Sequence, residues 1–276
     1  MAFITSADGT AIAYDRIGTG PVAILVDGAC CHRRFGPSAA IASRLADRFT
    51  VVTYDRRGRG DSGNHRESDA AREIEDLRAI VNAAGGPAFV CGISSGAMLA
   101  LEAASHGVPM KALALYEAPL IVDDKRAPIG PEYLAELQRM IALDRRSDAV
   151  RHFMRAVQVP AVAIALMRLM PSWSKLKEVA PTLVHDVSLV EPYWRGRPLP
   201  PDRWTSVDVP TLIMDGGKSP AWMRNAQRAL AAVVPGATTR TLDKQTHMVN
   251  ARVLASALVE FFLQADYPRR EKRVGR

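Results

Sequence analysis

The feature that most constrains this chain is a serine between two glycines, at the junction of a strand-like and a helix-like segment. The run Gly92-Ile93-Ser94-Ser95-Gly96 follows the apolar segment 88–91 and precedes a segment rich in alanine and leucine. Glycines at these spacings permit a sharp strand-to-helix turn, where larger side chains would collide, and the turn exposes the serine hydroxyl. The pattern predicts a nucleophilic Ser94. The alternative is a glycine- and serine-rich turn that only begins a helix.

Strand-like runs alternate with helical patterns around this turn. An opening hairpin is expected over 3–5 and 10–17. Further strands are expected over 22–27, 50–54, 88–92, 111–116, 209–214 and 238–242. Helices are expected over 67–84, 96–106, 220–233 and 250–264. Such alternation predicts an α/β fold, in which a mainly parallel central sheet is flanked by helices on both faces.

The alternation stops in the middle of the chain. Between about 123 and 208 there is no convincing strand, and helical segments near 131–145, 147–157, 160–170 and 173–190 are divided by prolines. The simplest interpretation is one α/β core formed by 1–122 and 209–266. It carries a helical lid insertion over 123–208 and ends in a basic C-terminal tail over 267–276.

Composition and charge are those of a globular protein. The chain is 48% hydrophobic and 24% charged, has no apolar run of membrane-spanning length, and begins without the features of a secretory signal. We therefore expect a cytoplasmic protein without a membrane partner. The net charge of +7 owes +4 to the segment 269–276, which is typical of a solvated end, so no nucleic-acid partner is expected. A homodimer is left open.

A serine hydroxyl needs a base to take its proton and amides to hold the resulting anion. His247 follows the last expected strand and is the candidate base, with an exposed loop histidine as the alternative. No cysteine and histidine residues show metal-ligand spacing, because Cys30-Cys31-His32 is too crowded for a tetrahedral site. The turn at Gly58-Arg59-Gly60 lacks the lysine and serine or threonine of a nucleotide loop. Neither a metal nor a cofactor is implied.

Three motifs together resemble the α/β-hydrolase superfamily. They are the turn Y-D-R-R-G-R-G-D-S at 54–62, the serine turn at 92–96, and V-P-T-L-I at 209–213. The resemblance covers 10–118 and 208–264. It is to the lidded branch that includes haloperoxidase-like esterases, C–C bond hydrolases and haloalkane dehalogenases. It implies that the base is the histidine after the final strand, which is His247, and that backbone amides form an oxyanion hole.

The first departure from the family pattern lies after the first central strand. Where the family usually has His-Gly, this chain has Asp27-Gly28-Ala29. The Ala29 N–H can still donate to the oxyanion, because a backbone amide does not depend on its side chain, and the second donor would be the Ser95 N–H. A carboxylate at Asp27 near the site would raise the pKa of His247. Alternatively, Asp27 pairs with a nearby arginine such as Arg33 or Arg34.

The second departure concerns the acid that orients the histidine. The family's usual aspartate position is Ser219 here, and a hydroxyl cannot stabilise an imidazolium as a carboxylate does. Haloalkane dehalogenases resemble this chain at another position, where an acidic residue closes the strand after the serine-bearing turn and its helix. Glu117 fills that position. Asp215, or no carboxylate at all, remains an alternative.

The predicted activity is serine hydrolysis of a small-molecule substrate. A serine rather than an aspartate nucleophile argues against dehalogenase and epoxide-hydrolase chemistry, which pass through a carboxylate ester. We expect a small, apolar carboxylic ester, lactone or thioester to be cleaved through an acyl-enzyme. Apolar lid residues could line its pocket or simply pack the lid: Met154, Met167, Met170, Trp173, Tyr193 and Trp194. Two alternatives stay open, a lyase or cofactor-free oxygenase that uses His247 as base, and a non-catalytic binding relative.

Overall fold

In the computed structural model, which describes residues 1–64 and 69–266, eight strands form one sheet in the order β1-β2-β4-β3-β5-β6-β7-β8. The strands are β1 (Ala2–Thr5), β2 (Ala11–Ile17), β3 (Val22–Val26), β4 (Thr50–Tyr54), β5 (Ala88–Ile93), β6 (Met110–Tyr116), β7 (Thr211–Gly216) and β8 (Thr238–Leu242). The β1–β2 and β2–β4 pairs are antiparallel, and all other pairs are parallel. The predicted hairpin and mainly parallel sheet are confirmed.

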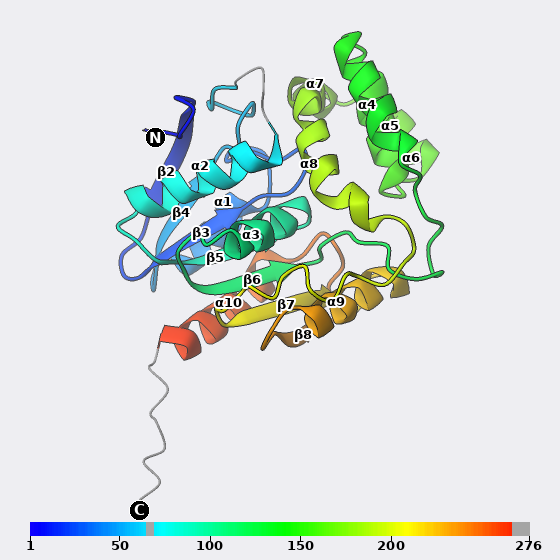
Figure 1. Ribbon diagram of the computed structural model, residues 1–276. Coiled ribbons are helices and arrows are strands. Elements are labelled where there is room, and N and C mark those ends of the chain that lie inside the picture. Colours follow the sequence, from blue (N-terminus) through cyan, green and yellow to red (C-terminus); the bar gives the residue numbers. More distant parts are fainter. Residues whose placement is uncertain (65–68, 267–276) are drawn as a thin grey trace, which may run out of the picture.

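Helices cover both faces of this sheet, as Figure 1 shows. One face carries α2 (Ala70–Ala83), α3 (Ser95–Ser105) and α9 (Ala221–Val233), and the other carries α1 (Ser38–Leu45) and α10 (Ala251–Asp266). Alternate side chains of a strand point to opposite faces. In β3, Ile24 therefore joins the first apolar cluster and Leu25 joins the second. Burial on both faces explains why the central strands are apolar without alternation.

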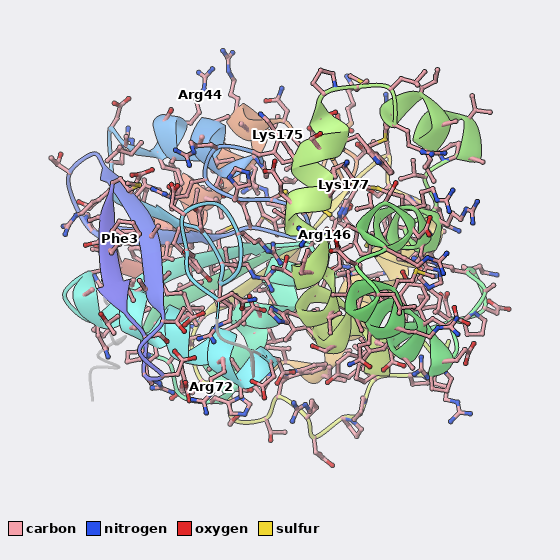
Figure 2. All side chains as sticks on the ribbon, turned by 90° about the horizontal axis from the view of Figure 1, so that it is seen from above. Phe3, Arg44, Arg72, Arg146, Lys175 and Lys177 are labelled. Atoms are coloured by element: carbon pink, nitrogen blue, oxygen red, sulfur yellow. The ribbon has the colours of Figure 1, made fainter. Side chains whose placement is uncertain are left out.

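The expected helical insertion is present between β6 and β7. It contains α4 (Glu132–Ala142), α5 (Arg146–Ala156), α6 (Ala161–Met167), α7 (Ser172–Val179), η1 (Ala180–Thr182), α8 (Leu183–Val190) and η2 (Glu191–Tyr193). Figure 1 shows α4 to α7 gathered beside the core, while α8 returns to pack against α2 and α3. Figure 2, seen from above, shows the N-terminal hairpin with Phe3 on one side of the molecule and the lid residues Arg146 and Lys177 well away from it.

Two local regions show how the helices are divided and stabilised. The helical region expected over 173–190, with Pro181 as a divider, is observed as α7, the 3-10 turn η1 and α8, because Pro181 has no N–H to continue an α-helix. The helix α1 was not predicted. It has eight residues, no side-chain cap at its N-terminus and no acidic residue in its first turn. Its packing on α10 and β4 therefore stabilises a segment with few local helix signals.

Some predictions fall on residues that the structure does not describe. The basic tail predicted over 267–276 lies outside the described residues, and so do residues 67 and 68 at the start of the helix predicted over 67–84. Within the described ranges, none of the helices combines the length and the apolar character needed to span a bilayer.

Candidate active site

Ser94 lies alone between the end of β5 and the start of α3, with φ of 58° and ψ of −125°. A positive φ is costly for a residue with a side chain, typically about 1–3 kcal/mol, and the surroundings must hold it. The Ser94 N–H donates to the Tyr116 carbonyl of the neighbouring strand at 2.9 Å. Ser94 thus has the strained backbone and the strand-to-helix position that the sequence predicts for a nucleophile.

The two glycines around Ser94 are required by close backbone contacts. A Cβ at Gly92 would lie 2.3 Å from the Gly96 carbonyl oxygen, and a Cβ at Gly96 would lie 2.3 Å from the Val26 carbonyl oxygen. Backbone atoms at a packed junction of strand and helix cannot move away as a flexible side chain can. The spacing of glycine, serine and glycine is therefore a packing requirement of this turn.

Strand order explains why the predicted site residues meet. In the sheet, β5 lies between β3 and β6, and β7 follows β6, all parallel. The carboxyl ends of parallel strands lie at one edge of a sheet, where open α/β folds bind ligands. Gly28 and Ala29 follow β3, Ser94 follows β5, and Glu117 follows β6.

Glu117 contacts His247 directly. Its side chain is completely buried, and its Oε2 lies 2.9 Å from His247 Nδ1. Its other oxygen, Oε1, accepts a hydrogen bond from the Gly216 N–H at 2.7 Å. Glu117 itself has a φ of 48°. The carboxylate is therefore fixed at both oxygens, with one of them facing the imidazole.

Neither Asp215 nor Ser219, which occupies the family's usual acid position, forms a hydrogen bond or ion pair with His247 among the described residues. Asp215 is buried at the end of β7, and its Oδ1 has no hydrogen-bond partner among the described residues. The Ser219 hydroxyl is likewise unpaired within the part of the chain that the structure describes. Of the three positions considered from the sequence, the structure brings only Glu117 to hydrogen-bond distance of the imidazole, while its catalytic role stays a prediction.

His247 lies in the segment between β8 and α10, with 41% of its side chain exposed. The Tyr116 hydroxyl donates to the carbonyl oxygen of the preceding residue, Thr246, at 2.6 Å and so holds this segment against β6. Among the described residues, Ser94 Oγ and His247 are not joined by a hydrogen bond. In ligand-free sites such a bond is often long and tightens only when substrate is bound.

The two predicted oxyanion donors belong to segments that adjoin Ser94. A Cβ at Gly28 would stand 2.9 Å from the Ser94 Cβ and 3.5 Å from its Oγ, so the chain entering Ala29 passes directly over the serine. Ser95 is the first residue of α3, where helical amides have no partner within the helix. Neither the Ala29 nor the Ser95 N–H is used in a turn, loop or cap bond within residues 1–64 and 69–266. Both amides are available to an anion.

Asp27 does not pair with either of the arginines suggested by the sequence. Arg33 binds Asp15, Asp55 and Asp61, and Arg34 binds Asp61. Asp27 is 2% exposed, and its Oδ1 has no hydrogen-bond partner among the described residues. Burial raises the pKa of Asp27 from 3.8 to about 6, although Ser38, Arg59 and Arg56 each lower it. The carboxyl group is therefore close to protonation at mildly acidic pH.

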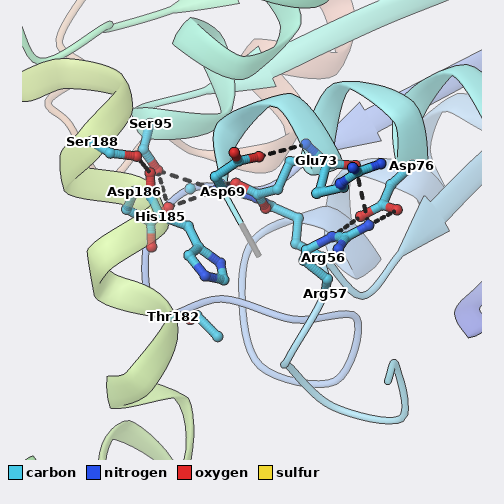
Figure 3. A network of polar contacts seen from close by, with 12 residues as sticks. Arg56, Arg57, Asp69, Glu73, Asp76, Ser95, Thr182, His185, Asp186 and Ser188 are labelled. Carbon is cyan, nitrogen blue, oxygen red and sulfur yellow. Dashed lines mark hydrogen bonds and ion pairs between the residues drawn. The ribbon is translucent and has the colours of Figure 1, made fainter. Parts of the chain in front are cut away.

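A buried network of charges beside the site was not predicted. Asp186 of α8 accepts hydrogen bonds from Arg56 Nη1 at 2.7 Å, Arg59 Nη2 at 2.6 Å and Ser95 Oγ at 2.7 Å. Arg56 also binds Glu73 of α2 at 2.5 Å. Burial by itself raises the pKa of Asp186, but Arg59 and Arg56 outweigh it and hold that pKa at about 2. Figure 3 shows Ser95 and Asp186 facing each other between α3 and α8.

One signal for this network was in the sequence. Helix α8 reads Leu-Val-His-Asp-Val-Ser-Leu-Val, so Asp186 is the one charged carboxylate in a helix whose other residues are five aliphatic ones, His185 and Ser188. A buried carboxylate needs charged partners, and three arginines stand together in the turn 54–62. The partner itself, 130 residues away from Arg56, could not be inferred from spacing.

The lid aromatics serve the packing of the lid. Trp173 and Trp194 are buried, and their indole N–H groups donate to Ser147 Oγ at 3.1 Å and to the Pro119 carbonyl at 2.6 Å. Met154, Met167 and Tyr193 pack against the main apolar cluster, whereas Met170 is 55% exposed. These contacts favour the packing interpretation over a direct role in a substrate pocket. No group of three or more potential metal ligands occurs among the described residues.

Comparisons with known proteins identify the family and the fold. Residues 18–257 match the family model described as alpha/beta hydrolase family. A solved alpha/beta hydrolase from Sphaerobacter thermophilus is 46% identical, with a TM-score of 0.87, and the match covers 95% of this chain and 100% of that one. A thermophilic esterase from Thermogutta terrifontis shares the fold, with a TM-score of 0.68 at 19% identity, over 96% of this chain and 99% of that one.

A curated sequence relative is also similar over nearly its whole length. The pimeloyl-[acyl-carrier protein] methyl ester esterase of Stenotrophomonas maltophilia is 29% identical over 257 residues, which are 90% of this chain and 95% of that protein. The family match, the sheet order and the strand-to-helix turn at Ser94 all lead to the same assignment. This chain belongs to the alpha/beta hydrolase family and is an esterase-like enzyme of that fold.

Proposed function

We propose that the protein is a serine hydrolase that cleaves a small, apolar carboxylic ester, lactone or thioester through an acyl-enzyme. The observation that carries this proposal is the 2.9 Å contact between His247 Nδ1 and the buried Glu117 carboxylate, beside a serine in a strained strand-to-helix turn. A nucleophile, a base and an acid that orients the base are the groups that acyl transfer requires.

In the proposed reaction, Ser94 Oγ attacks the substrate carbonyl carbon while His247 Nε2 takes the hydroxyl proton. The Ala29 and Ser95 amides stabilise the oxyanion of the tetrahedral intermediate. Collapse of the intermediate breaks the bond to the alcohol or thiol, which leaves with the proton from His247. A water molecule then gives a proton to His247 and attacks the acyl carbon. Collapse of this second tetrahedral intermediate breaks the bond to Ser94 Oγ, which takes the proton back from His247, and the carboxylic acid leaves.

In this scheme Glu117 accepts the Nδ1–H of His247 and so keeps Nε2 free to act as base. It also balances the positive charge that His247 gains in the transition state. The substrate class is supported by two similar proteins that are named as esterases.

Labelling with a fluorophosphonate, together with hydrolysis of p-nitrophenyl esters from acetate to octanoate, tests the proposal. We expect the wild type to be labelled and to turn over, and Ser94→Ala to lose both activities. Ser43→Ala, an exposed change on α1, is the matched serine control and should behave as the wild type. Labelling or turnover retained in Ser94→Ala would contradict the proposed nucleophile. An unlabelled wild type whose other activity requires His247 would favour the lyase or oxygenase alternative.

A further inference from the structure

The lid is tied to the predicted oxyanion hole through one buried carboxylate. Asp186 belongs to α8, the last α-helix of the lid, and is 1% exposed. Its two oxygens are shared among three donors that come from outside the lid, namely Arg56, Arg59 and Ser95. Two of these donors are connected to the predicted oxyanion amides. Arg59 binds the peptide group that carries the Ala29 N–H, and Ser95 carries the other N–H itself.

The first connection runs through Arg59. While Arg59 Nη2 binds Asp186, its Nη1 donates to the Gly28 carbonyl oxygen at 2.8 Å. That carbonyl belongs to the same planar peptide unit as the Ala29 N–H. In a trans peptide the C=O and the N–H point in opposite directions, so a donor that holds the oxygen also fixes the direction of the N–H. A hydrogen bond to the carbonyl further polarises the N–H and strengthens it as a donor.

The second connection runs through Ser95. Its Oγ donates to Asp186 Oδ1 at 2.7 Å, and Ser95 is the residue that begins α3 directly after the nucleophile. Holding this side chain fixes the position of the Ser95 backbone, whose N–H is the other predicted donor. Arg56 supports the same arrangement, because its Nη1 binds both Asp186 and, at 3.2 Å, the Asp27 carbonyl oxygen.

The charges of this cluster balance. Arg56 and Arg59 are opposed by Glu73 and Asp186, and all four side chains are about 1% exposed or less. A buried charge without its partner is strongly unfavourable. Loss of the Asp186 charge would therefore leave one arginine uncompensated and would loosen the guanidinium groups from the peptide oxygens that they hold.

We propose that Asp186 is a positioning residue, through which the lid holds both amides of the oxyanion hole in the direction that the transition state requires. The inference rests on the proposed function, since it assigns a role to residues that surround the same reaction. Asp186 acts through Arg59 and Ser95 and has no contact with the substrate. The position of α8 against α3 therefore affects kcat, because it sets the position of Asp186.

The test compares Asp186→Asn with Asp76→Asn. Asp76 is an equally buried carboxylate that pairs with Arg57 of the same turn at 2.7 Å, but it does not contact the peptides of residues 27–29 or 95. We expect Asp186→Asn to lower kcat for a p-nitrophenyl ester by roughly 10- to 100-fold, somewhat less than the loss of a whole oxyanion donor, with KM changed less than about threefold. Asp76→Asn should keep kcat within about twofold of the wild type, whatever its effect on Tm.

A transition-state analogue separates positioning from general damage. A trifluoromethyl ketone adds to the serine and presents an oxyanion to the two amides, so its Ki should rise in Asp186→Asn by the same factor by which kcat falls. A carboxylic acid product should bind about as before. Ser95→Ala keeps all four charges and removes only the hydroxyl link, so it tests the connection without exposing a buried charge and should lower kcat by roughly three- to tenfold.

Backbone amide spectra make the inference independent of turnover. In ¹⁵N-labelled protein without ligand, Asp186→Asn should shift the Ala29 and Ser95 amide resonances, and Asp76→Asn should not. The inference is overturned if these resonances stay in place, or if kcat and the ketone Ki stay within twofold of the wild type. By contrast, failure of the proposed hydrolase function would appear as turnover or labelling that survives Ser94→Ala.

Discussion

Replacing Glu117 by glutamine gives the sharpest test of the site. Glutamine has the same shape and can keep the hydrogen bond from the Gly216 N–H, which is 2.7 Å from the carboxylate. Its amide nitrogen would then face His247 Nδ1, where the carboxylate oxygen now lies at 2.9 Å. Because an amide N–H donates, Nδ1 would have to accept and the proton would move to Nε2. The imidazole would then be in the wrong tautomer to take the proton of Ser94.

The expected loss is large. When an acid that orients a catalytic histidine is replaced by its amide, kcat falls by roughly 10⁴-fold, which corresponds to about 5.5 kcal/mol of transition-state stabilisation. Folding stability should change far less, because the burial and the Gly216 hydrogen bond are retained. The two effects can therefore be separated by measuring Tm alongside kcat.

The assay is the steady-state hydrolysis of p-nitrophenyl butyrate, with the rate of fluorophosphonate labelling as a second readout. Asp215→Asn is the matched control, since Asp215 is a buried carboxylate on the adjacent strand that forms no hydrogen bond or ion pair with His247 among the described residues. A kcat for Glu117→Gln within tenfold of the wild type would refute the reasoning. A large loss in Asp215→Asn alone would assign the acid to the other strand.

Three further expectations follow from packing and burial. Gly96→Ala would place a Cβ 2.3 Å from the Val26 carbonyl oxygen and 2.6 Å from the Asp27 carbonyl oxygen. Both Tm and the rate of fluorophosphonate labelling of Ser94 should therefore fall sharply. Unchanged values would mean that the backbone of the turn can move to accommodate the methyl group. The pKa of Asp27 is raised from 3.8 to about 6, so its ionisation costs the native state stability as pH rises from about 4 to 6. The stability difference between Asp27→Asn and the wild type, measured as the free energy of unfolding, should therefore shift in favour of the variant by up to about 3 kcal/mol from pH 4 to pH 7.5. Urea melts that give the same difference at both pH values would contradict this. Phe262→Ala removes a fully buried ring stacked on Phe89 at a centroid distance of 4.7 Å and should cost about 3–5 kcal/mol in the same melts, whereas a cost below 1 kcal/mol would show that the cluster collapses around the gap.

Much of the site could be predicted from sequence because it depends on local patterns and on one general rule. The glycine spacing marks the turn at Ser94, and apolar runs mark the strands that end before Ala29 and Glu117. Ends of parallel strands meet at one edge, so residues that follow them gather there without further information. The contact between Glu117 and His247 is of this kind.

Other features depend on partners that no local pattern names. Arg33 and Arg34 follow Asp27 closely in sequence, yet they pair with carboxylates from the N-terminal hairpin and the turn 54–62. The helix α1 is stabilised by its contacts with α10, which lie more than 200 residues further along the chain. How deeply a side chain is buried and which charges surround it depend on such distant neighbours. The spacing of residues along the chain therefore does not predict either property.

The sequence by itself therefore determined the alternation of strands and helices, the strained turn at Ser94 and the order of the groups around it. These features depend on backbone sterics and apolar periodicity, which are properties of short stretches of sequence. Only the tertiary structure decided that one carboxylate oxygen of Asp27 has no hydrogen-bond partner among the described residues, and that Asp186 of the lid, 91 residues after Ser95, joins a network of charges at the start of α3. The physical reason is that a buried charge is stable only beside the partners that folding brings to it, and those partners come from both the core and the lid.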